Sequence, residues 1–136
     1  MNSLEIYQAL TAMGFGLDSG KYEPSYASEH ALGNGQYLYV KRNGDKPVSQ
    51  RPLVIHPDAI NLRHVIDAIP GLHCGWEKRL SSSYRRFPKN GDKEKYGYDA
   101  DVDSIDALNA LIHIVMDAPP AMPLPEAKKE MKKQMN

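Results

Sequence analysis

The chain has 136 residues, of which 41% are hydrophobic and 25% are charged, a composition typical of one globular domain. Basic and acidic residues number 17 each, so the formal net charge is zero. This balance removes the simplest charge argument for a nucleic-acid binder or for an acidic nucleic-acid mimic. A single cysteine, Cys74, excludes an intramolecular disulfide and favours a reducing compartment. Without a signal-peptide pattern or an apolar run near the roughly 20 residues that span a bilayer, we expect a cytoplasmic protein with no membrane segment.

The first residues predict a short amphipathic helix. Asn2 precedes Glu5 by three residues, the spacing of a capping box, and apolar residues then recur at helical spacing as far as Met13. Gly14 follows as a candidate C-cap. Residues 18–35 are rich in glycine, serine, glutamate and tyrosine without a clear period. We expect a loop there, with room for a brief strand at 22–26.

Two runs rich in β-forming residues, 37–40 and 53–55, are the strongest pattern in the chain. An Asn-Gly pair and Pro47 lie between them, so the two runs predict an antiparallel hairpin whose link is longer than a two-residue turn. The Leu-Val-Ile run at 53–55 shows no polar alternation, which predicts a central strand covered on both faces. The expected fold is a single α+β domain, with an antiparallel sheet built around this central hairpin and three helices packed on it.

The next segment predicts a second helix and then becomes ambiguous. Apolar residues at 62, 65, 66 and 69 fall at i, i+3, i+4 and i+7, and Pro70 stops the pattern. In 72–80, leucine and tryptophan favour burial while three consecutive charged residues do not. Residues 81–97 are polar and basic and indicate mainly a loop, which a short strand at 96–98 closes.

A last helix is predicted near the C-terminal end. Asp103 or Ser104 can cap it, and its apolar stripe runs from 105 to 115. Four prolines between 119 and 125 then prevent it from continuing. We therefore divide the chain into an α+β domain at 1–117 and a proline-rich linker with a basic tail at 118–136.

The order of these segments resembles the YgaC-like family of small, uncharacterised bacterial cytoplasmic proteins. The resemblance rests on a helix ending in Met13-Gly14-Phe15, followed by YLYVKR, PLVIHP, YRRFPK, KYG and a closing helix with Ala107-Leu108. It covers roughly residues 4–115. The resemblance implies an antiparallel sheet with packed helices in a cytoplasmic setting. It brings no known activity and no catalytic residues.

The strongest candidate site is the basic and aromatic segment 78–98. Arginine and lysine suit phosphates or the carboxylates of a partner, and exposed aromatic rings could stack on bases. Acidic residues at 77, 92 and 94 dilute the charge. The alternative is a solvated loop whose aromatic residues anchor it to the core. The residues that we predict at a partner-binding surface are Lys78, Arg79, Tyr84, Arg85, Arg86, Phe87, Lys89 and Tyr96.

Two other positions are candidates for chemistry. His56 ends the predicted central strand and could act as a general acid or base, but the proline that follows is equally typical of a strand end with a hydrogen-bonded imidazole. Cys74 adjoins His73, with His64 not far away. Because no second cysteine is present for a typical structural zinc site, we favour a buried or inert thiol.

The aspartates at 99, 101, 103 and 106 form an acidic string. An EF-hand loop starting at Asp99 would need glycine at its sixth position and glutamate at its twelfth, where this chain has Ser104 and Ala110. We interpret the string as acids gathered at a helix N-terminus. Neither a P-loop nor a dinucleotide-binding fingerprint is present, so the sequence predicts no cofactor and no metal.

These observations favour a non-catalytic, cytoplasmic protein that acts by binding a protein partner, in the manner of a toxin-immunity protein or a phage- or host-defence accessory. One alternative is a nucleic-acid-binding module that uses the segment 78–98. The other is an enzyme with His56 as its acid or base.

Overall fold

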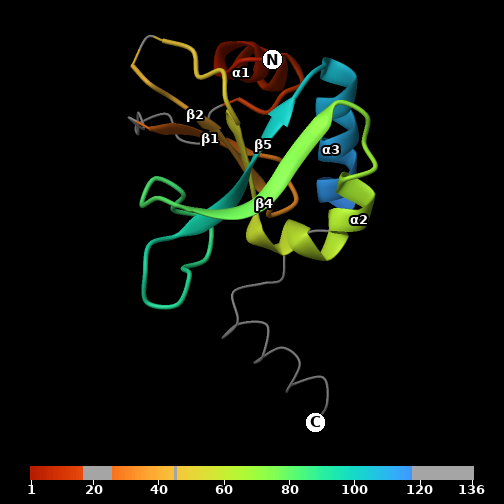
Figure 1. Cartoon of the computed structure of the whole chain (residues 1–136). Helices are drawn as coiled ribbons and strands as arrows, with labels where there is room; N and C mark the ends of the chain where they lie inside the picture. Colours follow the sequence, from red (N-terminus) through yellow and green to blue (C-terminus); the bar gives the residue numbers. More distant parts are fainter. Residues whose placement is uncertain (17–25, 45, 118–136) are drawn as a thin grey trace.

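The computed structural model describes residues 1–16, 26–44 and 46–117. It contains a five-stranded, fully antiparallel sheet with the strand order β1-β2-β3-β5-β4, together with three α-helices and one 3₁₀ helix (Figure 1). The predicted α+β domain is confirmed. The elements are α1 (Ser3–Ala12), β1 (Ala27–Ala31), β2 (Tyr37–Lys41), β3 (Leu53–Ile55), the 3₁₀ helix η1 (Pro57–Leu62), α2 (Arg63–Ile66), β4 (Leu72–Leu80), β5 (Tyr96–Val102) and α3 (Ile105–Asp117).

The predicted hairpin is the centre of the sheet. β2 and β3 pair antiparallel, with Tyr39 opposite Val54 and Val40 opposite Leu53. β3 lies between β2 and β5, and all three of its residues are 0% exposed. The prediction of a central strand covered on both faces is therefore confirmed.

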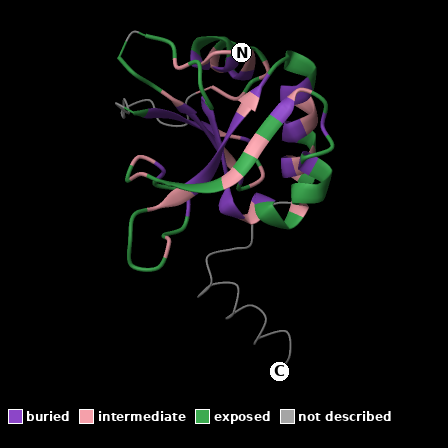
Figure 2. Cartoon of the chain, in the orientation of Figure 1, coloured by how far each residue is buried: buried purple, intermediate pink, exposed green. Residues whose placement is uncertain are grey.

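One face of the sheet carries the larger core. Because strand side chains alternate, Leu53 and Ile55 point to this face while Val54 points to the other. Helices α1 and α3 pack here through buried residues such as Leu10 and Leu111. Figure 2 shows buried residues concentrated along the middle strands and on the sides of the helices that meet them.

Both ends of α1 follow the sequence signals. Asn2 and Glu5 form the predicted capping box, in which each side chain accepts a 2.9 Å hydrogen bond from the backbone N–H of the other. At the other end Gly14 has φ +93°, and the Phe15 N–H reaches back to the Leu10 carbonyl at 2.8 Å. This closure belongs to a Schellman motif, which requires a left-handed residue that glycine adopts at no steric cost.

β1 corrects the expectation of a loop over 18–35. Its Ser28 lies opposite Val40 of β2, so an edge strand forms where no period was visible. The strand is buried although it is polar, because its polar groups have partners. The His30 Nδ1 lies 2.7 Å from the Phe15 carbonyl, and its Nε2 lies 2.8 Å from the Ser28 hydroxyl. Burial lowers the pKa of His30, against the opposing effect of its bond to Phe15. The brief strand expected at 22–26 falls almost wholly outside the described residues.

The helix predicted over 62–69 is shorter than its apolar pattern indicates. The chain first makes the 3₁₀ helix η1, with Pro57 at its start, and α2 then covers only four residues. Ile66 and Ile69 are buried, but Val65 is 39% exposed. Because η1 takes up the residues that follow Pro57 and Pro70 ends the helical pattern, little length remains between them for a regular α-helix.

Two strands replace ambiguous or misread segments in the second half. The ambiguous segment 72–80 is β4, and the short strand expected at 96–98 extends to Val102 as β5. Asp99 and Asp101 therefore lie in a strand, and the interpretation of the whole acidic string as a helix N-terminus is wrong. Ser104 caps α3 as predicted, since its hydroxyl accepts a 3.1 Å hydrogen bond from the Ala107 N–H.

The predicted tail at 118–136 lies outside the described residues. Among the helices of the described ranges, none combines the length and the apolar character that a membrane crossing needs.

Candidate partner-binding surface

The loop 81–95 joins β4 to β5 (Figure 1), and two of its aromatic side chains pack on the second face of the sheet. Tyr84 and Phe87 of this loop are buried against Tyr39 and Val54. The ring centres of Tyr39 and Phe87 lie 4.8 Å apart in an edge-to-face arrangement, and those of Tyr39 and Tyr84 lie 5.3 Å apart. The two aromatic residues of the loop thus anchor it to the sheet.

Gly97 of β5 makes room for this anchor. A Cβ atom at this position would lie 2.7 Å from the Val54 Cγ1, 2.8 Å from the Ile55 carbonyl oxygen and 2.9 Å from the Phe87 Cε2. Real Cβ atoms do not approach so closely, and two of the three neighbours belong to the central strand. Only glycine fits here without displacing the ring or the strand.

We expect Gly97→Ala to lower the free energy of unfolding by about 1–3 kcal/mol, the usual cost of overpacking. Urea unfolding would measure the change. Gly75→Ala is the matched control, because nothing lies within 4 Å of a Cβ atom at that position of β4. Equal stabilities for the two variants would show that the Phe87 ring does not occupy this space.

The buried carboxylate of Glu29 in β1 holds the loop against the sheet. The two oxygens of Glu29 each accept a 3.0 Å bond from the Arg85 guanidinium, and Glu29 also accepts a 2.7 Å bond from the Tyr39 hydroxyl. The Arg86 Nε lies 3.7 Å from the same carboxylate. Burial alone would raise the pKa of Glu29, but the bonds from Arg85 and Tyr39 and the two arginine charges lower it. The loop and the edge strand are therefore held together by a charged, hydrogen-bonded contact.

A second buried carboxylate links three strands. Asp99 of β5 accepts a 2.8 Å bond from the Lys41 ammonium of β2 and a 3.0 Å bond from the Arg79 Nε of β4. The Arg79 Nη2 also lies 3.3 Å from Glu77. The Arg79 side chain nevertheless stays 44% exposed, so its charge still faces solvent.

The surface above these anchors is basic. Seven basic and three acidic residues lie between 77 and 96, which leaves a positive excess even when Glu29 and Asp99 are counted against it. Figure 2 shows that the C-terminal end of β4 and much of the loop are exposed. Lys78 donates a 3.3 Å hydrogen bond to the Asn90 side chain, and its ammonium lies 5.4 Å from the centre of the Tyr96 ring. We call residues 77–80 together with the loop 81–95 the basic surface.

The structure divides the eight residues predicted at a binding surface into two groups, and within the first group Lys78 and Arg79 lie on opposite faces of the sheet. Lys78, Arg79 and Lys89 are exposed, and Tyr96 is half-buried. The other four residues hold the loop down, through buried rings or through contacts with Glu29: Tyr84, Arg85, Arg86 and Phe87.

Sequence reasoning missed the residues beneath the loop, namely Glu29, Lys41 and Asp99. Lys41, at the end of a β-rich run, was a weak signal of a residue that belongs to this site. For Glu29 no local signal exists, because its partner Arg85 is 56 positions away.

His56 has a structural role. Its Nδ1 accepts a 3.0 Å bond from the Asp58 N–H at the start of η1, and its ring packs against Phe87 at 5.1 Å between centres. Burial lowers the pKa of His56, although the charge of Asp58 opposes this effect. The imidazole therefore caps the start of η1 as a hydrogen-bond acceptor.

The remaining predicted candidate for chemistry is Cys74. Burial raises the pKa of the Cys74 thiol to about 11, which keeps it protonated at neutral pH. His73 points elsewhere, with its Nε2 3.0 Å from the Asp103 carboxylate. Within the described ranges, no three histidine, cysteine, aspartate or glutamate side chains are grouped so as to hold a metal ion.

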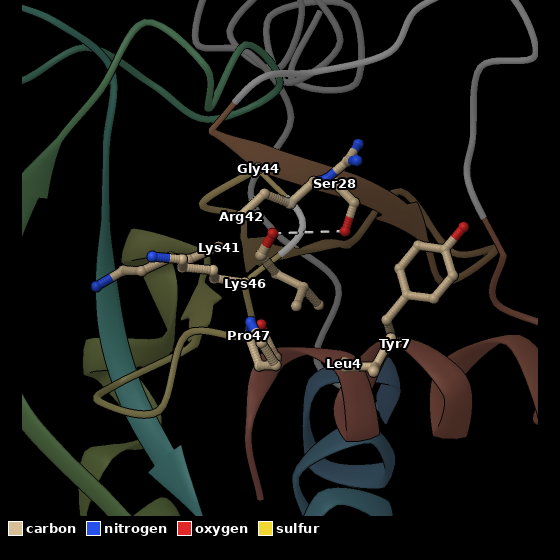
Figure 3. A pocket seen from close by; sticks show the side chains of 10 residues that line it. Leu4, Tyr7, Ser28, Lys41, Arg42, Gly44, Lys46 and Pro47 are labelled. Carbon is tan, nitrogen blue, oxygen red and sulfur yellow. Dashed lines mark hydrogen bonds between the residues drawn. The ribbon is translucent and has the colours of Figure 1, made fainter.

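A hollow of about 410 Å³ lies on the helix side of the sheet (Figure 3). Leu4 and Tyr7 of α1 form one wall, and the link that follows β2 forms another. The Ser28 hydroxyl lines it but is fully buried and lies 3.4 Å from the Val40 carbonyl. This hollow is separate from the basic surface.

Comparison of the chain with models of protein families, with curated proteins and with solved structures gives no match. The resemblance to the YgaC-like family therefore stays a prediction.

Proposed function

We propose that the protein is a non-catalytic, cytoplasmic binding protein whose basic surface engages an acidic surface of a protein partner. One observation carries the proposal: a loop with an excess of positive charge is fixed to the sheet by buried anchors while its Lys89 and Lys93 stay exposed. In the proposed function, a toxin-immunity protein or a phage- or host-defence accessory would hold its partner through this surface. Complementary charge of this kind raises association rates and selects partners.

Nucleic acid is the second candidate, because lysine and arginine also bind phosphates. It has less support, since sequence-tolerant binding of single strands uses exposed aromatic rings as stacking platforms. Tyr84 and Phe87 are buried, and the Lys78 ammonium lies over the half-buried Tyr96. The enzyme alternative has the least support, because His56 is buried as a helix cap.

Affinity capture from a lysate of the source cells, before and after nuclease treatment, tests the proposal. The test variant is Lys78→Glu/Lys93→Glu, since both lysines are exposed on the basic surface and neither contacts Glu29 or Asp99. The control is Lys46→Glu/Arg63→Glu, which changes the net charge equally at exposed positions outside that surface.

We expect the wild type and the control to capture the same protein, with no effect of nuclease, and the test variant to capture at least tenfold less. Capture that nuclease abolishes would favour nucleic acid instead. Undiminished capture by Lys78→Glu/Lys93→Glu would exclude the basic surface as the binding site. Arg85 and Arg86 are poor targets for this purpose, because their loss would also release Glu29.

A further inference from the structure

We infer that the open edge of β4 accepts an extended acidic segment of the partner as a sixth strand, an inference that rests on the proposed binding function. β4 pairs with β5 on one side, and no strand of the described ranges lies on its other side. An open edge offers unpaired N–H and C=O groups. Many proteins bind extended peptides by pairing such groups with the backbone of the peptide.

The hydrogen-bond register identifies which backbone groups point outward. Arg79 lies opposite Gly97 and Leu80 opposite Tyr96, and the Ser81 N–H bonds to the Lys95 carbonyl at 2.8 Å. In an antiparallel pair, hydrogen-bonded and non-hydrogen-bonded residues alternate. The backbone groups of Arg79 therefore face β5, while those of Lys78 and Leu80 point away from the sheet.

The usable edge is short and flanked by positive charge. A register shift between Cys74 and Lys78, with Trp76 at φ +57°, interrupts the middle of β4. The regular edge at the end that carries the basic surface is thus 78–80. Arg79, which pairs with Asp99 and Glu77, lies on one face of the sheet and Lys78 on the other, so a carboxylate on either face of an incoming strand would lie near a cation. Leu80, 44% exposed, adds an apolar contact.

Charge favours an acidic segment as the occupant of this edge. Two β4 strands that pair antiparallel about Arg79 place the arginine opposite itself, and pairing about Lys78 places that lysine opposite itself, although this register also brings Glu77 of each copy opposite Arg79 of the other. Like charges directly opposite one another destabilise a sheet. A strand with alternating carboxylates places all of them on one face, where they lie near Lys78 or near Arg79 according to the face that they occupy.

The test uses a capped decapeptide of five Thr-Glu repeats, with five Thr-Lys repeats as the charge control, and follows binding by amide NMR. Leu80→Pro removes an outward N–H without removing a bond to β5, and proline is tolerated on edge strands for this reason. Leu80→Ala is the matched control, because it removes the side chain and keeps the N–H.

We expect the Thr-Glu peptide to bind and the Thr-Lys peptide not to bind. Leu80→Pro should weaken binding at least tenfold relative to Leu80→Ala. A second measurement uses the wild type and so does not depend on whether the proline variant folds. Saturating peptide should slow hydrogen exchange of the Lys78 and Leu80 amides at least tenfold.

Equal binding by the proline and alanine variants, without protection of those two amides, would overturn strand addition and leave a charge-only contact with the basic surface. Absence of any Thr-Glu binding would also overturn it. The lysate capture experiment judges the proposed function separately, because it does not depend on backbone pairing.

Discussion

Val54→Asp is expected to abolish the cooperative unfolding transition of the protein. Val54 is fully buried in the middle of the sheet, with Tyr39 opposite it on one side and Asp99 on the other. The new carboxylate would be desolvated beside the buried Asp99, whose two cations already have a partner. An unpaired buried charge costs several kcal/mol, against a total stability of roughly 5–15 kcal/mol for a domain of this kind.

Thermal unfolding followed by circular dichroism measures this effect, and Val65→Asp is the control. It makes the same substitution in the exposed part of α2, where a change below about 0.5 kcal/mol is usual. A Val54→Asp protein that melts like the control would mean that β3 is not the central strand.

Glu29→Ala should be the most damaging substitution of a charged residue, with a loss of roughly 3 kcal/mol or more in the free energy of unfolding. It leaves the buried Tyr39 hydroxyl without its acceptor and releases both arginine contacts. Removing one partner of a buried pair costs about 3–5 kcal/mol, and the partial exposure of Arg85 places the expectation near the lower end.

Urea unfolding measures the loss, and Glu77→Ala is the control. Glu77 is also an acid paired with arginine, but it lies exposed on the surface, so its removal should change stability by less than about 0.5 kcal/mol. Similar values for the two variants would contradict the role of Glu29 in holding the loop.

The elements that could be predicted are those whose stability comes from local patterns. The capping box at Asn2, the apolar run of β3 and the cap at Ser104 each act within a few residues, and each is found where the sequence places it. These signals were sufficient for the fold class, because a central hairpin and packed helices leave few other arrangements.

The elements that could not be predicted depend on distant partners. β1 has the sequence ASEHA, which looks like a loop until His30 meets the Phe15 carbonyl and Glu29 meets Arg85. β4 loses the two-residue period at its irregularity around Trp76. Asp99 of β5 resembled part of a helix N-terminus because its pairing with Lys41 is invisible along the chain.

The same limit applies to the candidate site. The basic character of 78–98 is a property of composition and was visible at once. Whether Tyr84 is exposed or buried depends on Tyr39, which lies on another strand, so the division of the segment into anchors and exposed lysines appears only in three dimensions.

The anchored loop has a consequence for the thermodynamics of association. Restricting one backbone residue to a single conformation costs about 1–2 kcal/mol of entropy. If a loop of this length became ordered only on contact with a partner, this entropic cost would reduce the favourable free energy of binding. Here Tyr84, Phe87 and the Glu29 contact impose the restriction when the chain folds. A partner that binds here would therefore meet a backbone with little freedom left to lose, and less of the interaction energy would be spent on ordering the loop.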